Sequence, residues 1–176
     1  MNKRLVMLLV LIVLAAAARL IPHPPNFAPV AAIALFGGAY LTDNRLALLL
    51  PLSAMLLSDL VLGFHGQMIA VYGGFMITVG IGVLLRDRLG LWSVAGAALA
   101  SSLVFFLLTN FSVWLFDGMY PITLEGLVAC YIAAIPFFQN SLAGNLFYVA
   151  VLFGGFAVLE RRLPELRLPV SGGAPA

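Results

Sequence analysis

The chain has 176 residues, of which 63% are apolar and only 9% are charged, and its mean hydropathy is +1.11. A soluble domain is about 45–50% apolar and about 25% charged, so this chain has too few polar residues to cover a water-facing surface. The same composition excludes a disordered chain, and the single cysteine, Cys130, excludes a disulfide framework. The sequence therefore predicts an all-α integral membrane protein.

Six apolar runs, separated by proline, glycine or charged residues, predict six membrane-spanning helices. A hydrocarbon core of about 30 Å is crossed by about 20 helical residues. The runs cover residues 5–21, 27–41, 46–64, 68–85, 89–109 and 141–159. The first run resembles a secretory signal, but its length favours a retained span. Prolines end this run, and Asn26 is in position to cap the second.

Residues 110–140 do not form one clean apolar run. They contain Asp117, Glu125 and Pro136, with a moderately apolar piece at residues 124–138. We expect a connecting loop followed by a short helix that is interfacial or partly re-entrant at the outer side of the membrane. This helix lies between the fifth and sixth spans.

The positions of Lys and Arg favour six spans over seven. Basic residues gather in cytoplasmic loops, and six spans with both termini cytoplasmic place eight of the nine basic residues inside. A seventh span at residues 124–138 would place Arg161 and Arg162 outside. We therefore expect one six-span domain at residues 1–163 and a flexible cytoplasmic tail at residues 164–176. The expected location is the inner (plasma) membrane of a bacterium.

With this threading, acidic and uncharged polar residues gather at the outer side. Asp59 is the most informative, because an ionised carboxylate inside an apolar helix costs about 2.5–3.5 kcal/mol. Two interpretations are open: a functional role, or a structural pair with Arg19. His23, His65 and Asp59 are metal-ligand types, but their spacing is not that of a compact metal site. We predict no cofactor.

Glycines and small residues predict close helix packing, with Gly74, Thr78 and Gly82 four residues apart as a contact stripe. The sequence has no glycine-rich nucleotide-binding loop, no zinc-protease motif and no nucleophile elbow. We therefore do not expect an enzyme, and nothing points to a nucleic acid as a partner. The expected partners are the lipid bilayer and a small-molecule solute.

The layout resembles the substrate-binding S components of energy-coupling factor vitamin transporters. The resemblance rests on six short spans, cytoplasmic termini, an acid near the outer end of the third span, a long outer connection after the fifth, and the segment at residues 19–38. The sequence is also similar to a group of bacterial membrane proteins with no assigned role. The alanines that dock S components, four apart in span one, are not reproduced here, since Arg19 follows Ala15 by four.

The resemblance implies a vitamin or precursor bound under outer loops 1, 3 and 5. It also implies a separate transmembrane coupling subunit and two ATPases. Carried over by position, the site residues are Asn26, Asp59, Gln67, Asn110 and Trp114. The acids near them predict a neutral or cationic, ring-containing solute.

Two other functions are open from the sequence. In the first alternative, the chain is a non-catalytic accessory or assembly subunit of a larger membrane complex and associates through its glycine stripes. The third alternative is a membrane enzyme or a metal or haem carrier that uses His23, His65 and Asp59.

Overall fold

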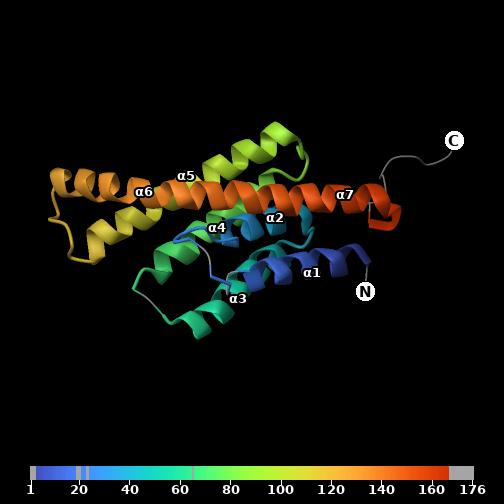
Figure 1. Cartoon of the computed structure of the whole chain (residues 1–176), viewed down its shortest axis with the longest axis horizontal. Coiled ribbons are helices and arrows are strands. Elements are labelled where there is room, and N and C mark those ends of the chain that lie inside the picture. The colour runs from blue at the N-terminus through green and yellow to red at the C-terminus, as the bar shows by residue number, and fades with distance from the viewer. Residues whose placement is uncertain (1–2, 19–20, 23, 65, 167–176) are drawn as a thin grey trace.

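The computed structural model describes residues 3–18, 21–22, 24–64 and 66–166, and all regular structure in these ranges is helical. The helices in chain order are α1 (Lys3–Ala18), α2 (Val30–Tyr40), α3 (Asn44–Leu62), α4 (Met68–Leu84), α5 (Leu91–Phe116), α6 (Leu124–Val149), a π-helical turn (Ala150–Gly154) and α7 (Gly155–Arg162). The last three elements form one continuous helix of 39 residues, Leu124–Arg162 (Figure 1). The described residues thus form six helical rods, as predicted.

Three of these rods are long and apolar enough to cross a membrane: α3, α5 and the continuous helix Leu124–Arg162. Helices α2 and α4 are apolar but shorter. These lengths and compositions support the prediction of a membrane protein.

The connection between the fifth and sixth rods is shorter than predicted. Helix α5 runs to Phe116 rather than ending at residue 109, and residues 124–138 are the first part of the last long helix rather than a separate interfacial helix. Pro136 lies inside this helix without ending it. The connection between α5 and α6 turns tightly at the start of α6, because a Cβ on Gly126 would lie 2.1 Å from the Pro121 carbonyl oxygen.

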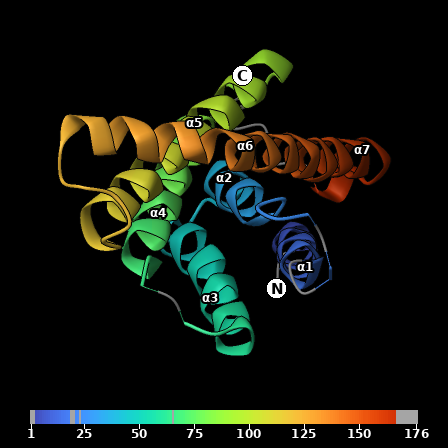
Figure 2. The same ribbon diagram turned by 60° about the vertical axis from the view of Figure 1, so that its left-hand side comes forward.

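Helix α2 is the centre of the molecule (Figure 2). Nine of its eleven residues are buried, and its closest neighbour is α4. A Cβ on Gly38 would lie 2.3 Å from the Val79 carbonyl oxygen, and one on Gly82 would lie 2.3 Å from that of Leu35. The two backbones therefore pack with no room for a side chain between them. Gly74, Thr78 and Gly82 are all buried, which confirms the predicted contact stripe.

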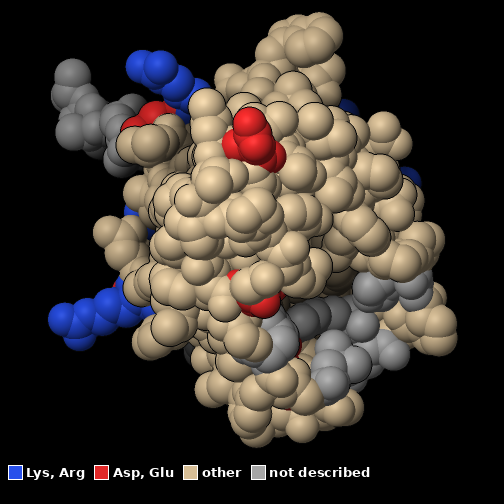
Figure 3. Space-filling model, turned by 90° about the vertical axis from the view of Figure 1, so that its left-hand side faces the viewer, with Lys and Arg blue, Asp and Glu red and all other residues tan. Residues whose placement is uncertain are grey.

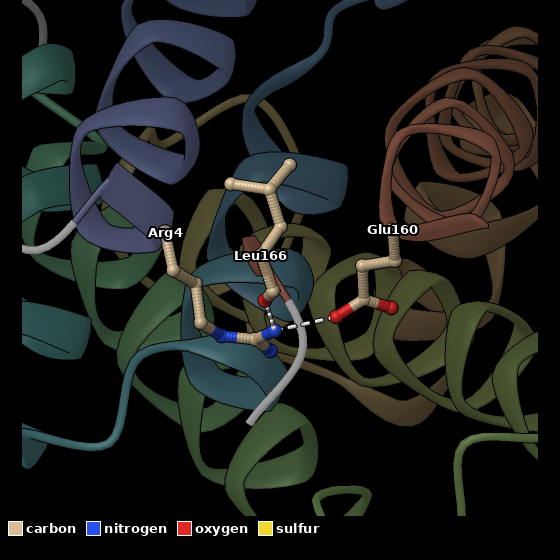
Figure 4. Close-up of polar contacts among 3 residues, drawn as sticks. All are labelled: Arg4, Glu160 and Leu166. Atoms are coloured by element: carbon tan, nitrogen blue, oxygen red, sulfur yellow. Dashed lines mark hydrogen bonds and ion pairs between the residues drawn. The ribbon is translucent and has the colours of Figure 1, made fainter. Parts of the chain in front are cut away.

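One end of the bundle is held by cations. The Arg86 guanidinium donates to the carbonyl oxygens of Gly38 at 2.9 Å and of Leu41 at 2.5 Å, and so satisfies the C-terminal end of α2. Arg4 is buried and donates to the Glu160 carboxylate at 2.5 Å and to the Leu166 carbonyl oxygen (Figure 4). The first helix is thereby joined to the end of the last one.

The predicted tail at residues 164–176 begins with a packed segment. Pro164–Leu166 forms a 3-10 turn, Leu166 is buried, and Glu165 pairs with Lys3 at 2.6 Å. Leu166 is anchored because its carbonyl oxygen accepts from buried Arg4. Residues 167–176 lie outside the described part of the chain.

Candidate functional site

A cavity of about 460 Å³ lies among α2, α3, α4, α5 and α6. Cavities that bind small molecules and cofactors have volumes of about 300–1,000 Å³, so this one has the size of a ligand site. Its polar lining residues are Asn26, Ser102, Thr109, Asn110 and Ser141, and its aromatic ones are Phe75, Phe105, Phe106, Phe137 and Phe138. No charged residue is among the described residues that line it.

Helices α5 and α6 each contribute one stripe to the cavity wall. The lining positions are 102, 105, 106, 109 and 110 on α5, and 134, 137, 138 and 141 on α6. Steps of three and four residues place side chains on one face of a helix. Each helix therefore turns a face containing a Phe-Phe pair toward the cavity.

The phenylalanine rings contact one another across the helix interfaces. The centroids of Phe75 on α4 and Phe105 on α5 are 5.0 Å apart, and those of Phe106 on α5 and Phe138 on α6 are 4.7 Å apart. These tilted pairs have the spacing of favourable aromatic contacts. These ring pairs join α4 to α5 and α5 to α6 beside the cavity.

Three polar side chains of the wall already donate to carbonyl oxygens of their own helices. The Thr109 hydroxyl donates to the Phe105 carbonyl oxygen at 2.8 Å, and the Ser141 hydroxyl donates to that of Phe137 at 3.1 Å. The Asn110 amide donates to the Phe106 carbonyl oxygen at 2.8 Å. Since hydroxyl and amide oxygens accept hydrogen bonds, these three side chains offer acceptors to a ligand.

Asn26 lies at the edge of the cavity in the loop before α2. The Phe27 N–H donates to the Pro24 carbonyl oxygen at 3.0 Å, and Asn26 has φ of 62° within this turn. Asparagine tolerates that left-handed conformation better than most residues. The predicted capping role of Asn26 is wrong, because α2 begins at Val30 with Pro29 at its N-cap.

The structure brings two of the five predicted site residues to the cavity, Asn26 and Asn110. Asp59 is not in its wall. This residue is 1% exposed, and the Tyr72 hydroxyl donates to its carboxylate at 2.8 Å. Arg19, its predicted partner, lies outside the described residues.

Gln67 and Trp114 also lie outside the cavity wall and bond to the α5–α6 connection. The Gln67 amide donates to the Asp117 carboxylate, and the Trp114 indole N–H donates to the Pro121 carbonyl oxygen at 3.0 Å. Both contacts fix the path of the chain at this end of the bundle.

The predicted metal alternative has no geometric support where the structure can test it. No group of three or more His, Cys, Asp or Glu is close enough to hold a metal among the described residues. His23 and His65, which that alternative requires, are outside the described ranges.

The phenylalanine walls were not predicted from the sequence. Trp114 is the one aromatic residue in the predicted site, whereas the cavity is lined by Phe105, Phe106, Phe137 and Phe138. The available signal was a Phe-Phe pair on each of two consecutive helices.

Residues 1–166 match a protein family described as a family of unknown function, DUF6580. Neither a curated protein nor a solved structure gives a match.

Proposed function

The chain belongs to the DUF6580 family of unknown function, and from its own geometry we propose that it is a substrate-binding membrane subunit for uptake of a small solute. One observation carries the proposal: a cavity of about 460 Å³ among five helices, apolar and aromatic in its walls with a few polar groups. This combination is typical of small-molecule sites. The proposed solute is vitamin-like and contains a ring that packs between the phenylalanines.

The lining favours a neutral solute over a cationic one. The described cavity wall contains no charged residue, and a charge in an apolar site without a partner carries a large desolvation cost. Asp59, the acid that motivated a cationic ligand, contacts Tyr72 outside the wall.

The proposed topology has six spans with both termini cytoplasmic. Its support is that the start of α1, the turn after α2, the turn after α4 and the end of α7 lie at one end of the bundle, joined by contacts of Arg4 and Arg86. The described basic residues near this end are Lys3, Arg4, Arg45, Arg86, Arg88, Arg161 and Arg162. Such clustering is typical of a cytoplasmic side.

The opposite end has the character expected of an outer side. Figure 3 looks onto the end that carries the α5–α6 connection, where acidic side chains stand on the near face and basic ones are seen only toward its edge. Asp117 and Glu125 are the acids of this connection. A tag after Ala176 that is accessible only from the periplasm would contradict this topology.

An energising module is part of the proposal. The sequence has no nucleotide-binding loop of its own, and in the transporter family that the layout resembles a separate module hydrolyses ATP. We expect a transmembrane coupling subunit with two ATPases to fill that role.

The experiment is a thermal unfolding screen of the purified protein in lipid nanodiscs against vitamins and their precursors. A ligand that binds only the folded state raises the melting temperature. Asn110→Leu should weaken binding of a hit roughly three- to tenfold, the effect of one hydrogen bond, whereas Asn140→Leu on α6, outside the cavity wall, should not.

No shift with any compound would contradict the proposal. If a stoichiometric membrane partner then co-purified with the chain, the result would support the accessory-subunit alternative.

A further inference from the structure

A buried polar cluster lies beside the cavity, between α5 and α6. Asn145 is 1% exposed, and its side-chain nitrogen lies 3.0 Å from the Ala98 carbonyl oxygen, 3.2 Å from Ser101 Oγ and 2.8 Å from Ser102 Oγ. Ser102 belongs to both the cluster and the cavity wall. Asn145 is therefore outside the cavity wall but contacts Ser102, which is part of it.

The orientation of the Asn145 amide follows from its neighbours. A backbone carbonyl oxygen only accepts hydrogen bonds, so the atom facing Ala98 must be the amide nitrogen. The same nitrogen then donates to Ser102, which makes Ser102 Oγ an acceptor in this contact. The hydroxyl proton of Ser102 therefore needs an acceptor other than Asn145 Nδ2.

The usual acceptor for that proton is already occupied. A helical serine commonly donates to the carbonyl oxygen four residues earlier, which for Ser102 is that of Ala98. Ala98 accepts from the Ser101 hydroxyl at 3.0 Å and from Asn145. The described residues show no hydrogen bond from the Ser102 hydroxyl to another acceptor, although Thr109 and Ser141 in the same wall both donate to their own helices.

We infer that Ser102 is a hydroxyl donor of the cavity and recognises an acceptor on the ring of the solute, a carbonyl oxygen or a ring nitrogen. Asn145 is the positioning residue that keeps the Ser102 proton available. The Thr109 and Ser141 hydroxyl protons are already used within their own helices, so Ser102 is the one hydroxyl of the described wall whose proton is available to a ligand. A donor at this position discriminates among ring compounds of equal size. This inference rests on the proposed function and specifies its substrate class.

The test compares quinoline with naphthalene, two fused-ring compounds of nearly the same shape that differ by one ring nitrogen. Binding is measured by saturation-transfer NMR on the full chain in nanodiscs. The signal from the Ala134→Leu variant, in which a larger side chain fills the cavity, is subtracted as lipid background. Quinoline should bind roughly two- to tenfold more tightly than naphthalene, the effect of one hydrogen bond.

The preference for quinoline should disappear in Ser102→Ala. It should also disappear in Asn145→Leu, because the released Ala98 carbonyl then takes the Ser102 proton. Ser112→Ala, a serine on the same helix that lies outside the cavity wall, should retain the preference.

Equal binding of the two compounds to the unmodified chain, or a preference that survives in Ser102→Ala, would overturn the inference while leaving the ring-binding cavity supported. If neither compound binds above background, the proposed function itself fails, and this inference fails with it.

Discussion

The α2–α4 interface and the α4, α5 and α6 walls of the cavity show two opposite kinds of helix packing. In the first, Gly38 and Gly82 let two backbones meet with no space for a methyl group. In the second, phenylalanine side chains line a volume of about 460 Å³ that the packing of the helices leaves open.

This contrast separates the closely packed part of the molecule from the part that we propose binds a solute. Within a membrane, helices associate through close packing of small residues rather than through expulsion of water. The glycine interface therefore holds α2 and α4 together, and the phenylalanine walls line the proposed ligand site. Substitutions that add or remove volume should affect the two regions differently.

The largest effect is expected from Gly38→Ala. The added Cβ would lie 2.3 Å from a backbone oxygen, which cannot rotate away, so α2 and α4 must separate. We expect a loss of at least about 3 kcal/mol in the free energy of unfolding, measured by titration with denaturing detergent. Gly80→Ala is the control, since a Cβ there meets nothing within 4 Å; equal losses in both variants would contradict the packing account.

A smaller loss in the free energy of unfolding is expected when the contacts at the end of the α2–α4 interface are weakened. Arg86→Gln removes charged hydrogen bonds to the last carbonyl groups of α2, and should lower the free energy of unfolding by about 1.5–3 kcal/mol. Arg88→Gln changes an exposed neighbour and should have little effect. The same detergent titration measures both variants. An unchanged free energy of unfolding in Arg86→Gln would show that water replaces the hydrogen bonds of Arg86 to α2.

Adding volume on the cavity side should change binding rather than folding. Ala134→Leu projects into the cavity, so we expect a change in unfolding free energy below about 1 kcal/mol and at least tenfold weaker binding of a solute found in the thermal screen. Ala133→Leu, its exposed neighbour, should preserve binding. Retained affinity in Ala134→Leu would place the site elsewhere.

The smallest effect is expected from Trp114→Phe. This change removes the indole donor to Pro121 and keeps an aromatic ring, so about 1 kcal/mol or less of stability should be lost. Solute affinity should be unchanged, because Trp114 is outside the cavity wall. A tenfold loss of affinity would restore Trp114 to the site.

The sequence predicted the helices best where small residues fix their packing. The stripe of Gly74, Thr78 and Gly82 could be found because residues four apart share a face of a helix. The end of α5 was missed because Asn110 reads as a loop residue. In the structure its amide donates to the Phe106 carbonyl oxygen one turn earlier, which lets a polar residue remain inside the helix.

The cavity was predictable only in part. Asn26 and Asn110 stand out in an apolar sequence, and both line it. A phenylalanine in an apolar helix faces lipid or protein with equal ease, and only the packing of α4, α5 and α6 decides which. Ser102 and Asn145 required the same information, since their contact joins residues 43 positions apart.

The continuous helix Leu124–Arg162 carries both a wall of the cavity and Glu160, the residue that pairs with Arg4. Phe138 and Glu160 are separated by 22 residues of unbroken helix, or about 33 Å at about 1.5 Å per residue, close to the thickness of a hydrocarbon core. A tilt imposed on one end of this helix is thus transmitted to its other end, because no loop interrupts it.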